Sequence, residues 1–322
     1  MLGPEAVLFA DADVSGEGAS EALRPAHGSA RNAEELLEWG YARQLVRMVR
    51  GRRVDYSRSV AAKISVVLLA KDESDRLPGA LATVGWADEV LVVDTGSSDG
   101  TPDIARAAGA RVVEIPWEGY VASRNRAISL ASHDWVFFVD ADERAPEALR
   151  DEILGRVAAD GETLAGLLMP RLSNFLGRPV RHGAWYPDVQ FRMGRRSRGF
   201  RVVGGRVHET YAADGPVVRL RSPLHHEPYR NLSDYLRKSA VYARLAAEDR
   251  AERGDRSGPA SILLRPPFEF VRSFLLKGGF LDGAAGAQVA FVHAWYYLLR
   301  AAYLREIRRD SGASTRRAGG RR

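Results

Sequence analysis

Two aspartates separated by one residue stand directly after an apolar segment, and together they could hold a metal ion. The segment is Asp134-Trp-Val-Phe-Phe-Val-Asp-Ala-Asp-Glu143, whose apolar part is typical of a buried β-strand. Because side chains of an extended chain alternate between two faces, Asp140 and Asp142 point the same way. Converging carboxylates repel each other unless a cation lies between them, and Mg²⁺ or Mn²⁺ prefers such oxygen ligands. The spacing therefore indicates a site for a divalent metal and a diphosphate.

The alternative for this pair is the acidic start of a helix, because Pro146 follows and carboxylates stabilise a helix N-terminus. The preceding elements help to decide between the two. Strands are expected at 64–70, 89–94, 111–115 and in the segment above, alternating with helices at 78–84, from 101, and at 120–131. Each strand is a continuous apolar run, which is typical of a mostly parallel sheet covered by helices on both faces. The expected fold class is α/β.

Polar residues follow three of these strands, at the edge where a parallel sheet binds its ligands. They are Lys71, Asp72 and Glu73 after the first strand, Asp94 after the second, and Asp140 and Asp142 after the fourth. Acidic residues placed at random would not gather at three strand ends, so the arrangement favours a binding site over a helix cap. Carboxylates at the first two ends also suit the base N–H and ribose hydroxyl groups of a nucleoside.

The chain lacks the glycine-rich loops that bind nucleotide phosphates in other α/β proteins. The turn Thr95-Gly-Ser-Ser-Asp-Gly-Thr101 has neither the Rossmann glycine spacing nor a Walker lysine, which argues against a dinucleotide oxidoreductase. Nothing resembles the glycine-rich entry loop of a nucleotidyltransferase. A diphosphate bound here would need a metal and an arginine to offset its charge, and Arg124 is the candidate arginine.

The composition is that of a globular protein without cysteine. The 322 residues are 45% hydrophobic and 27% charged. The lack of cysteine excludes disulfides, zinc–thiolate sites, iron–sulfur clusters and thiol nucleophiles, and it fits a reducing cytosol. Residues 1–10 lack the pattern of a secretory signal. The net charge of +6 could serve nucleic acid, anionic lipid or phosphorylated substrates.

Four parts are expected along the chain. Residues 1–60 form an N-terminal extension, partly disordered, with one amphipathic helix at 31–53. Residues 61–235 form the α/β domain, 236–310 a helical region, and 311–322 a disordered basic tail. Further elements are expected as short strands at 164–170, 189–193, 199–203, 206–211 and 217–220, and a helix at 231–252.

Four stretches of the α/β domain carry motifs that point to one family: 64–73, 90–101, 123–125 and 134–143. They resemble the nucleotide-sugar-binding half of a family 2 glycosyltransferase with the Rossmann-like GT-A fold. Four motifs in this order are far more specific than an isolated Asp-x-Asp. Later stretches, 181–192, 207–209 and 277–283, resemble the branch that contains the lipopolysaccharide core-region β-glucosyltransferases. The likeness runs from about residue 63 to 308 and leaves residues 1–60 outside.

The resemblance implies a nucleotide-sugar site at the strand ends. Asp72 or Glu73, with Lys71 beside them, and Asp94 would hold a uridine-like nucleoside. Arg124 would face the base or the diphosphate of the donor. A UDP-sugar is the favoured donor.

The resemblance also implies the ligands of a divalent metal, Mg²⁺ or Mn²⁺. Asp142 would be the principal ligand, with Asp140 beside it in contact with the nucleotide-sugar. A histidine from the later half sometimes completes the metal shell in this superfamily, and His226 is the candidate here. The alternative for His226 is a structural pair with His225, packed beneath the sheet.

An inverting transferase needs a general base that takes the proton of the acceptor hydroxyl. Asp188 and Glu209 compete for this role, and either could instead be a structural ion pair with Arg192 or Arg206. Glu209 lies in a sequence resembling the family's His-Glu-Asp bases, but Thr210 replaces the second acid, so Asp188 is favoured. The aromatic loop around Asp188 also suits a sugar, with His182, Trp185 and Tyr186 as acceptor-binding candidates.

The helical region has features of a segment that lies on a membrane. Its uncharged run at 284–299 is shorter than the roughly 20 residues that span a bilayer. Arg265 and Lys277 flank large apolar side chains at 268–276, and aromatic residues follow at 295–303. This combination is typical of a helix resting on anionic lipid. The alternative is an ordinary helical pair packed against the catalytic domain.

The expected function is an inverting, metal-dependent transfer of a hexose from a nucleotide-sugar to a glycan or lipid-linked acceptor. The expected pathway is cell-envelope polysaccharide or lipopolysaccharide biosynthesis, and the expected location is the cytoplasmic face of the inner membrane. The alternative is a non-catalytic protein that binds nucleotide-sugar or glycan on the same fold. Dispersed arginines without a recognised binding module argue against nucleic acid as a partner.

Overall fold

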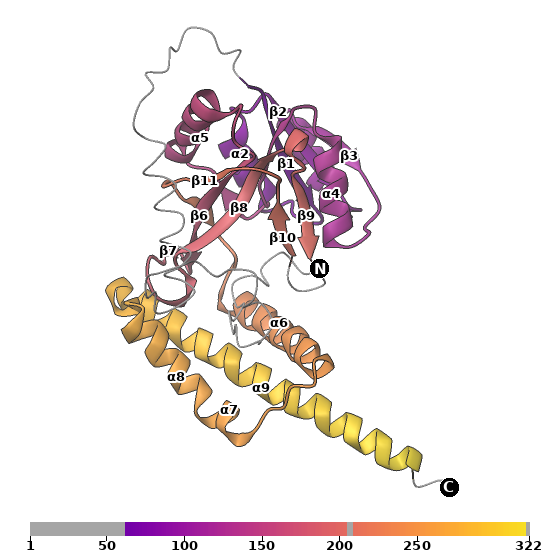
Figure 1. Ribbon diagram of the computed structural model, residues 1–322, viewed down its shortest axis with the longest axis vertical. Coiled ribbons are helices and arrows are strands. Elements are labelled where there is room, and N and C mark those ends of the chain that lie inside the picture. Colours follow the sequence, from indigo (N-terminus) through magenta and orange to yellow (C-terminus); the bar gives the residue numbers. More distant parts are fainter. Residues whose placement is uncertain (1–61, 205–208, 320–322) are drawn as a thin grey trace, which may run out of the picture. The chain divides into compact units, whose positions relative to one another are not determined.

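The structure is a computed structural model that describes residues 62–204 and 209–319 (Figure 1). The N-terminal extension predicted at 1–60, with its amphipathic helix, lies outside the described residues. The same holds for residues 205–208, which include the first three residues of the strand predicted at 206–211.

A ten-stranded mixed sheet forms the centre of the catalytic half, in the order β3-β2-β1-β4-β8-β6-β12-β5, with β7 and β11 paired to β6. A separate two-stranded sheet joins β9 and β10. The strands are β1 Ile64–Ala70, β2 Glu89–Asp94, β3 Arg111–Glu114, β4 Trp135–Phe138, β5 Glu143–Arg144, β6 Gly166–Phe175, β7 Arg178–Pro179, β8 Asp188–Arg195, β9 Arg201–Gly204, β10 Glu209–Ala212, β11 Val217–Arg219 and β12 Leu224–His226.

The first four strands are parallel, which confirms the predicted α/β class. Ala70 pairs with Asp94 between β1 and β2, and Val67 pairs with Phe138 between β1 and β4. This register brings the carboxyl ends of the three strands to one edge. The prediction of a mostly parallel sheet needs correction for the second half, because β8 runs antiparallel to both β4 and β6. Residues 176–187 connect β6 to β8, and the chain returns along β6 in the opposite direction as β8.

Helices cover both faces of the parallel strands, as predicted. They are α2 Leu77–Val84, α3 Thr101–Ala107, α4 Tyr120–Leu130 and α5 Glu147–Asp160. Side chains alternate along β1, so Val66 and Leu68 pack with α2, α3 and α5, while Val67 packs with α4 on the other face. The helix predicted to start at Thr101 does begin there, and Asp99 accepts hydrogen bonds from the Thr101 backbone N–H and hydroxyl at its start.

The C-terminal region is helical, and it shares an aromatic core with Phe175 and Trp185 of the preceding domain. Its elements are α6 Leu232–Glu252, α7 Pro259–Leu263, α8 Arg265–Val271, the π-helical turn η4 Arg272–Leu276, the 3₁₀ turn η5 Gly279–Asp282, and α9 Gly283–Gly319. Tyr235 of α6 and Tyr296 of α9 belong to one buried cluster, and the Tyr235 hydroxyl donates to the Val292 carbonyl at 3.0 Å. α9 therefore packs on α6, and it continues to Gly319, past the predicted tail boundary at residue 311.

Among the described residues, every helix is too short or too polar to cross a membrane.

Candidate active site

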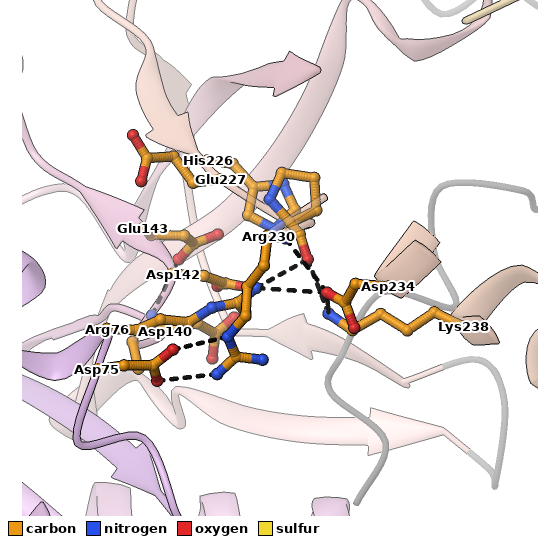
Figure 2. A network of polar contacts seen from close by, with 12 residues as sticks. Asp75, Arg76, Asp140, Asp142, Glu143, His226, Glu227, Arg230, Asp234 and Lys238 are labelled. Carbon is orange, nitrogen blue, oxygen red and sulfur yellow. Dashed lines mark hydrogen bonds and ion pairs between the residues drawn. The ribbon is translucent and has the colours of Figure 1, made fainter. Parts of the chain in front are cut away.

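The structure brings together Asp142, the predicted principal metal ligand, and His226, the predicted histidine ligand (Figure 2). Asp142 lies just beyond β4, and His226 is the last residue of β12. The His226 Nε2 atom faces the Asp142 Oδ2 atom at 3.6 Å, and the other ring nitrogen, Nδ1, lies 3.1 Å from the Ser173 hydroxyl in β6. Ser173 thus fixes the orientation of the ring toward Asp142.

The donor atoms of this pair fit a divalent cation. Their separation is longer than a hydrogen bond, and a second hydrogen bond that orients a histidine is usual for a metal ligand. Although burial raises it, the interaction with His226 and the charge of Arg76 hold the pKa of Asp142 well below its usual range, so this carboxylate is ionised. The described residues contain no cluster of three or more potential ligand side chains, and Mg²⁺ often takes only one or two carboxylates, with water and phosphate completing its shell.

Arg76 connects the Asp142–His226 pair to the start of α6. Its guanidinium donates to Asp142 Oδ2 at 3.2 Å and to the Pro228 carbonyl at 3.2 Å, and it lies 3.8 Å from Asp234 Oδ2. The Lys238 ammonium donates to the same carbonyl at 2.7 Å (Figure 2). Two cations therefore gather beside Asp142, where a diphosphate would need charge compensation.

Asp140 is held by two buried arginines rather than facing an open site. Arg124 NH2 donates to its Oδ1 atom at 3.0 Å, and Arg192 NH2 donates to its Oδ2 atom at 2.6 Å. Arg124, predicted to face the base or the diphosphate, also donates to the Tyr211 hydroxyl at 2.8 Å. Both predicted roles stay predictions, and the structure makes these residues part of a buried ion-pair network.

The network continues through Glu143 to Asp188, the favoured base. Arg192 NH2 also donates to Glu143 Oε1 at 2.6 Å, and Glu143 is fully buried. Arg171 lies 3.6 Å from Glu143 Oε1 and donates through its Nε to Asp188 Oδ2 at 2.7 Å. The Gln190 amide donates to Asp188 Oδ1 at 2.6 Å. The ion pair suspected for Asp188 is therefore present, but with Arg171 rather than Arg192. Arg206, the other suspected partner, lies outside the described residues.

Glu209, the second base candidate, lies at the other end of the same network. Its Oε1 atom is 3.9 Å from Arg124 Nε. Its Oε2 atom is buried and has no hydrogen-bond partner in the described part of the chain. Burial raises the pKa of Glu209 against the opposing charge of Arg124. A carboxylate with a free oxygen and a raised pKa has the properties of a general base.

Asp94 and Asp72 shape the turn after β2. Asp94 is 1% exposed, and its Oδ2 atom accepts the Gly96 and Ser97 backbone N–H groups, each at 2.9 Å. Asp72 Oδ1 accepts from the Ser98 N–H at 2.7 Å. Both residues predicted to bind the nucleoside thus accept hydrogen bonds from backbone N–H groups of this turn. Asp72 is the more accessible of the two.

Glu73 and Lys71 complete the predicted nucleoside group at the end of β1. Both are half-buried, and Lys71 makes no polar contact with the other described side chains. The Oε2 atom of Glu73 is buried without a hydrogen-bond partner among these residues. Burial raises the pKa of Glu73 to about 7. The positive charge of Arg76 lowers this pKa, and the negative charge of Asp142 raises it.

The raised pKa of Glu73 predicts a pH-dependent gain in stability for Glu73→Gln in metal-free buffer. The stabilisation linked to the Glu73 proton is full below about pH 4.5 and disappears as pH rises through about 7. The free energy of unfolding of the variant should therefore rise relative to the wild type by about 1–2 kcal/mol between pH 5 and 8.5, after allowance for partial exposure. Urea titrations measure this difference, and parallel curves would contradict it.

The acceptor-binding candidates fall into different environments. Trp185 is 1% exposed, and its ring packs at 5.5–6.1 Å from the rings of Phe175, Tyr229 and Tyr235. This packing does not favour the stacking of a sugar on Trp185. Tyr186 is half-buried, and His182 bonds through Nδ1 to Asp282 at 2.9 Å.

Sequence reasoning missed the roles of four residues, namely Arg76, Glu143, Arg171 and Arg192. Glu143 was visible at the end of the opening motif, but nothing local showed that it would be fully buried. Arg171 and Arg192 lie on β6 and β8, which reach the site only through the antiparallel half of the sheet. Arg76 precedes α2 and had no distinguishing neighbour pattern.

Known proteins to which this chain is similar include glycosyltransferases. The sequence model of glycosyl transferase family 2 matches residues 65–210. The lipopolysaccharide core biosynthesis glycosyltransferase LpsC of Rhizobium meliloti is 28% identical over 72% of this chain and 90% of its own length. An uncharacterized glycosyltransferase of Rickettsia conorii is 27% identical over 78% of this chain and 92% of its own.

Among solved structures, glucosyl-3-phosphoglycerate synthase from Mycobacterium tuberculosis, crystallised with Mn²⁺ and UDP, is similar with a TM-score of 0.39. The two are 20% identical, over 62% of this chain and 82% of that one. The region that the family model matches, residues 65–210, contains most of β1, all of β2 to β4, the Asp140–Asp142 pair and the network that ends at Glu209. The family model thus identifies residues 65–210 as a glycosyl transferase family 2 domain, and the chain is a glycosyltransferase.

Proposed function

We propose that this protein is an inverting, metal-dependent hexosyltransferase that uses a nucleotide-sugar, with UDP-sugars favoured. The acceptor is a glycan or lipid-linked glycan of cell-envelope polysaccharide or lipopolysaccharide. The observation that carries the proposal is the Asp142–His226 pair beside a buried network. This network ends at a Glu209 oxygen that has no hydrogen-bond partner among the residues the structure describes. The likeness to LpsC over most of both chains supports the class of acceptor.

On the donor side, Asp142 and His226 hold the metal, and Arg76 lies within reach of the same carboxylate at 3.2 Å. When bound, the metal offsets the charge that develops on the departing diphosphate. Arg76 adds a guanidinium that can turn from Asp142 to a phosphate oxygen. Asp72 and Glu73 lie at the edge where the nucleoside is expected. Asp140 acts indirectly, by fixing Arg124 and Arg192.

On the acceptor side, the general base is the less certain assignment from sequence, and two structural features favour Glu209 over Asp188. Asp188 accepts hydrogen bonds at both oxygens, from Arg171 and Gln190. Glu209 keeps one oxygen unpaired within the described residues, and its pKa is raised by burial. In this proposal Glu209 takes the proton of the acceptor hydroxyl, while Asp188 holds Arg171 in place.

The metal site gives a direct prediction for binding. Asp142→Asn and His226→Ala should each weaken Mn²⁺ binding in the presence of UDP by at least the roughly 10- to 100-fold that loss of an outer-shell partner costs, because each removes or weakens a direct ligand. Electron paramagnetic resonance of free Mn²⁺ measures this without any turnover. Asp75→Asn is the matched control, since Asp75 lies in the same polar cluster but pairs with Arg230 at 2.6 Å (Figure 2). Equal Mn²⁺ affinity of all three variants would contradict the assignment.

Thermal shift with a panel of UDP-, GDP- and dTDP-sugars tests the donor class. A ligand that binds only the folded protein stabilises it by RT ln(1 + [L]/Kd), so the true donor should raise Tm in a metal-dependent manner. A panel in which no nucleotide-sugar raises Tm would contradict the proposed function. Donor binding without sugar transfer to any acceptor would favour the non-catalytic alternative.

We also propose that the protein is peripheral on anionic membrane, through the segment 259–300. Exposed apolar side chains crowd α7, α8, η4 and η5: Leu263, Leu264, Phe268, Val271, Leu275, Leu276, Phe280 and Leu281. The only acidic residues of this segment, Glu269 and Asp282, have largely buried side chains engaged in internal contacts. The outer surface is thus apolar and basic, which complements anionic lipid. The cytoplasmic face is the expected side.

Binding to anionic liposomes tests the membrane proposal on the full chain. Leu264→Gln/Leu276→Gln should bind at least about tenfold more weakly, because each leucine loses about 1.5–3 kcal/mol of burial in lipid. Trp117→Gln/Leu154→Gln is the control, since both side chains are exposed on the catalytic half. Sedimentation with vesicles measures binding, and equal binding by wild type and both variants would contradict this surface.

A further inference from the structure

The motif 277–283 of the C-terminal region contacts a loop that leads to the active site. Asp282, in the turn η5, accepts two consecutive backbone N–H groups at Oδ2, from Arg181 at 2.9 Å and from His182 at 2.8 Å. Its Oδ1 atom lies 2.9 Å from the His182 Nδ1 atom. The side chain of Asp282 is 7% exposed, so these bonds form away from water. A buried carboxylate that accepts three hydrogen bonds is a strong fixing point.

The next two N–H groups of the loop are bound by the same region. Gly183 N–H donates to the Lys277 carbonyl at 2.9 Å, and Ala184 N–H donates to the Ser273 hydroxyl at 3.1 Å. Gly183 has a φ of +82°, and a Cβ there would lie 3.2 Å from the Ser273 hydroxyl. Four consecutive N–H groups, from 181 to 184, are therefore accepted by residues 273–282.

The fixed loop ends at the acceptor side of the site. Trp185 follows in the buried aromatic cluster, then half-buried Tyr186, and Asp188 begins β8 three residues after Trp185. Asp188 accepts a hydrogen bond from Arg171, which lies beside Glu143. Arg192 joins Glu143 to Asp140. Arg124 then joins Asp140 to Glu209, so the network runs from Asp188 to Glu209. A displacement of the loop would therefore move Tyr186 and one end of this network together.

We propose that Asp282 is a positioning residue for the acceptor side. It holds the loop 181–185, and through it Tyr186 and Asp188, in the geometry that the acceptor needs. This inference rests on the proposed function, because it takes the acceptor to bind beside this loop. It gives a role to the motif 277–283, which lies about 100 residues from the loop in sequence and outside the nucleotide-binding half.

Asp282→Ala in the full chain tests the proposal, with Asp310→Ala as control because Asp310 is exposed and pairs with Arg309. Hydrogen exchange should show faster exchange at amides 181–184 in Asp282→Ala alone. The kcat/KM for the acceptor should fall by about 10- to 100-fold, since small displacements of catalytic groups have effects of this size. Hydrolysis of the donor by water, without acceptor, should stay within about twofold, because no hydrogen bond or ion pair within the described residues joins the loop 181–185 to Asp142 or His226.

Two milder variants keep the test informative if Asp282→Ala does not fold. Asp282→Asn retains one oxygen acceptor and should give an intermediate loss, and Ser273→Ala removes only the bond to Ala184. Faster exchange at 181–184 with unchanged acceptor kinetics would overturn the positioning role. Unchanged exchange in all three variants would overturn the fixing of the loop. A wild type that transfers no sugar would instead count against the proposed function, and hydrogen exchange would still report on the loop.

Discussion

Replacing Glu209 with glutamine is expected to lower kcat for sugar transfer by about 10²- to 10⁴-fold, the range that a general base contributes. The amide keeps the size of the side chain but cannot take the acceptor proton. The Kd of the donor, measured by thermal shift or calorimetry, should stay within about twofold. The reason is that Glu209 lies beside Arg124 and not beside Asp142, the proposed metal ligand.

Asp188→Asn is the paired experiment, because Asp188 is the base favoured by the sequence. If Glu209 is the base, Asp188→Asn should retain measurable transfer, with its loss arising from a weakened bond to Arg171. A Glu209→Gln variant with full turnover and an inactive Asp188→Asn variant would reverse the assignment. The pH profile of the wild type adds a check: since burial raises the pKa of Glu209, kcat/KM should fall on the acid side at a higher pH than for an ordinary glutamate.

Replacing Arg192 with methionine is expected to reduce the free energy of unfolding by about 3–5 kcal/mol, the usual cost of removing one partner of a buried ion pair. Arg192 is 2% exposed and donates to both Asp140 and Glu143 at 2.6 Å. Methionine keeps most of the apolar stem of the side chain. The loss of unfolding free energy therefore reports the cost of leaving Asp140 and Glu143 without the guanidinium that they share.

A matched exposed pair and the pH dependence separate this effect from a general loss of packing. Arg106→Met removes a surface pair with Asp103 and should change stability by less than about 1 kcal/mol. Burial already raises the pKa of Glu143 against the charge of Arg192, so removing Arg192 should raise it further. The stability deficit should then be larger at pH 8 than at pH 5, because protonation of Glu143, which lower pH favours, removes an unpaired buried charge. A deficit independent of pH would contradict this explanation.

The first half of the fold could be predicted because its signals are local. The strands at Ile64–Ala70 and Glu89–Asp94 have the bounds expected from their apolar runs. Their parallel register then places Asp72, Asp94 and Asp142 at one edge without further information. Continuous apolar runs and turn residues are sufficient for this level of prediction.

The polar network could not be predicted, because its members come from strands whose order is not encoded locally. Arg171 and Arg192 lie on neighbouring antiparallel strands that join the sheet beside β4 and bring two guanidinium groups under the site. From the sequence alone, Asp140 therefore looked like an open metal ligand, whereas two arginines hold it. Trp185 looked like a sugar platform for the same reason, because its aromatic partners Tyr229 and Tyr235 come from much later in the chain.

In the proposed function, Asp142 and its neighbours support metal-dependent transfer from a nucleotide-sugar. The most direct measurement is the release of nucleoside diphosphate from the best donor of the panel, followed with added Mg²⁺ or Mn²⁺ and after chelation. The wild type should release diphosphate and form glycoside only with metal, and Asp142→Asn should do neither while remaining folded. Full turnover by the chelated wild type, or by Asp142→Asn, would contradict the account.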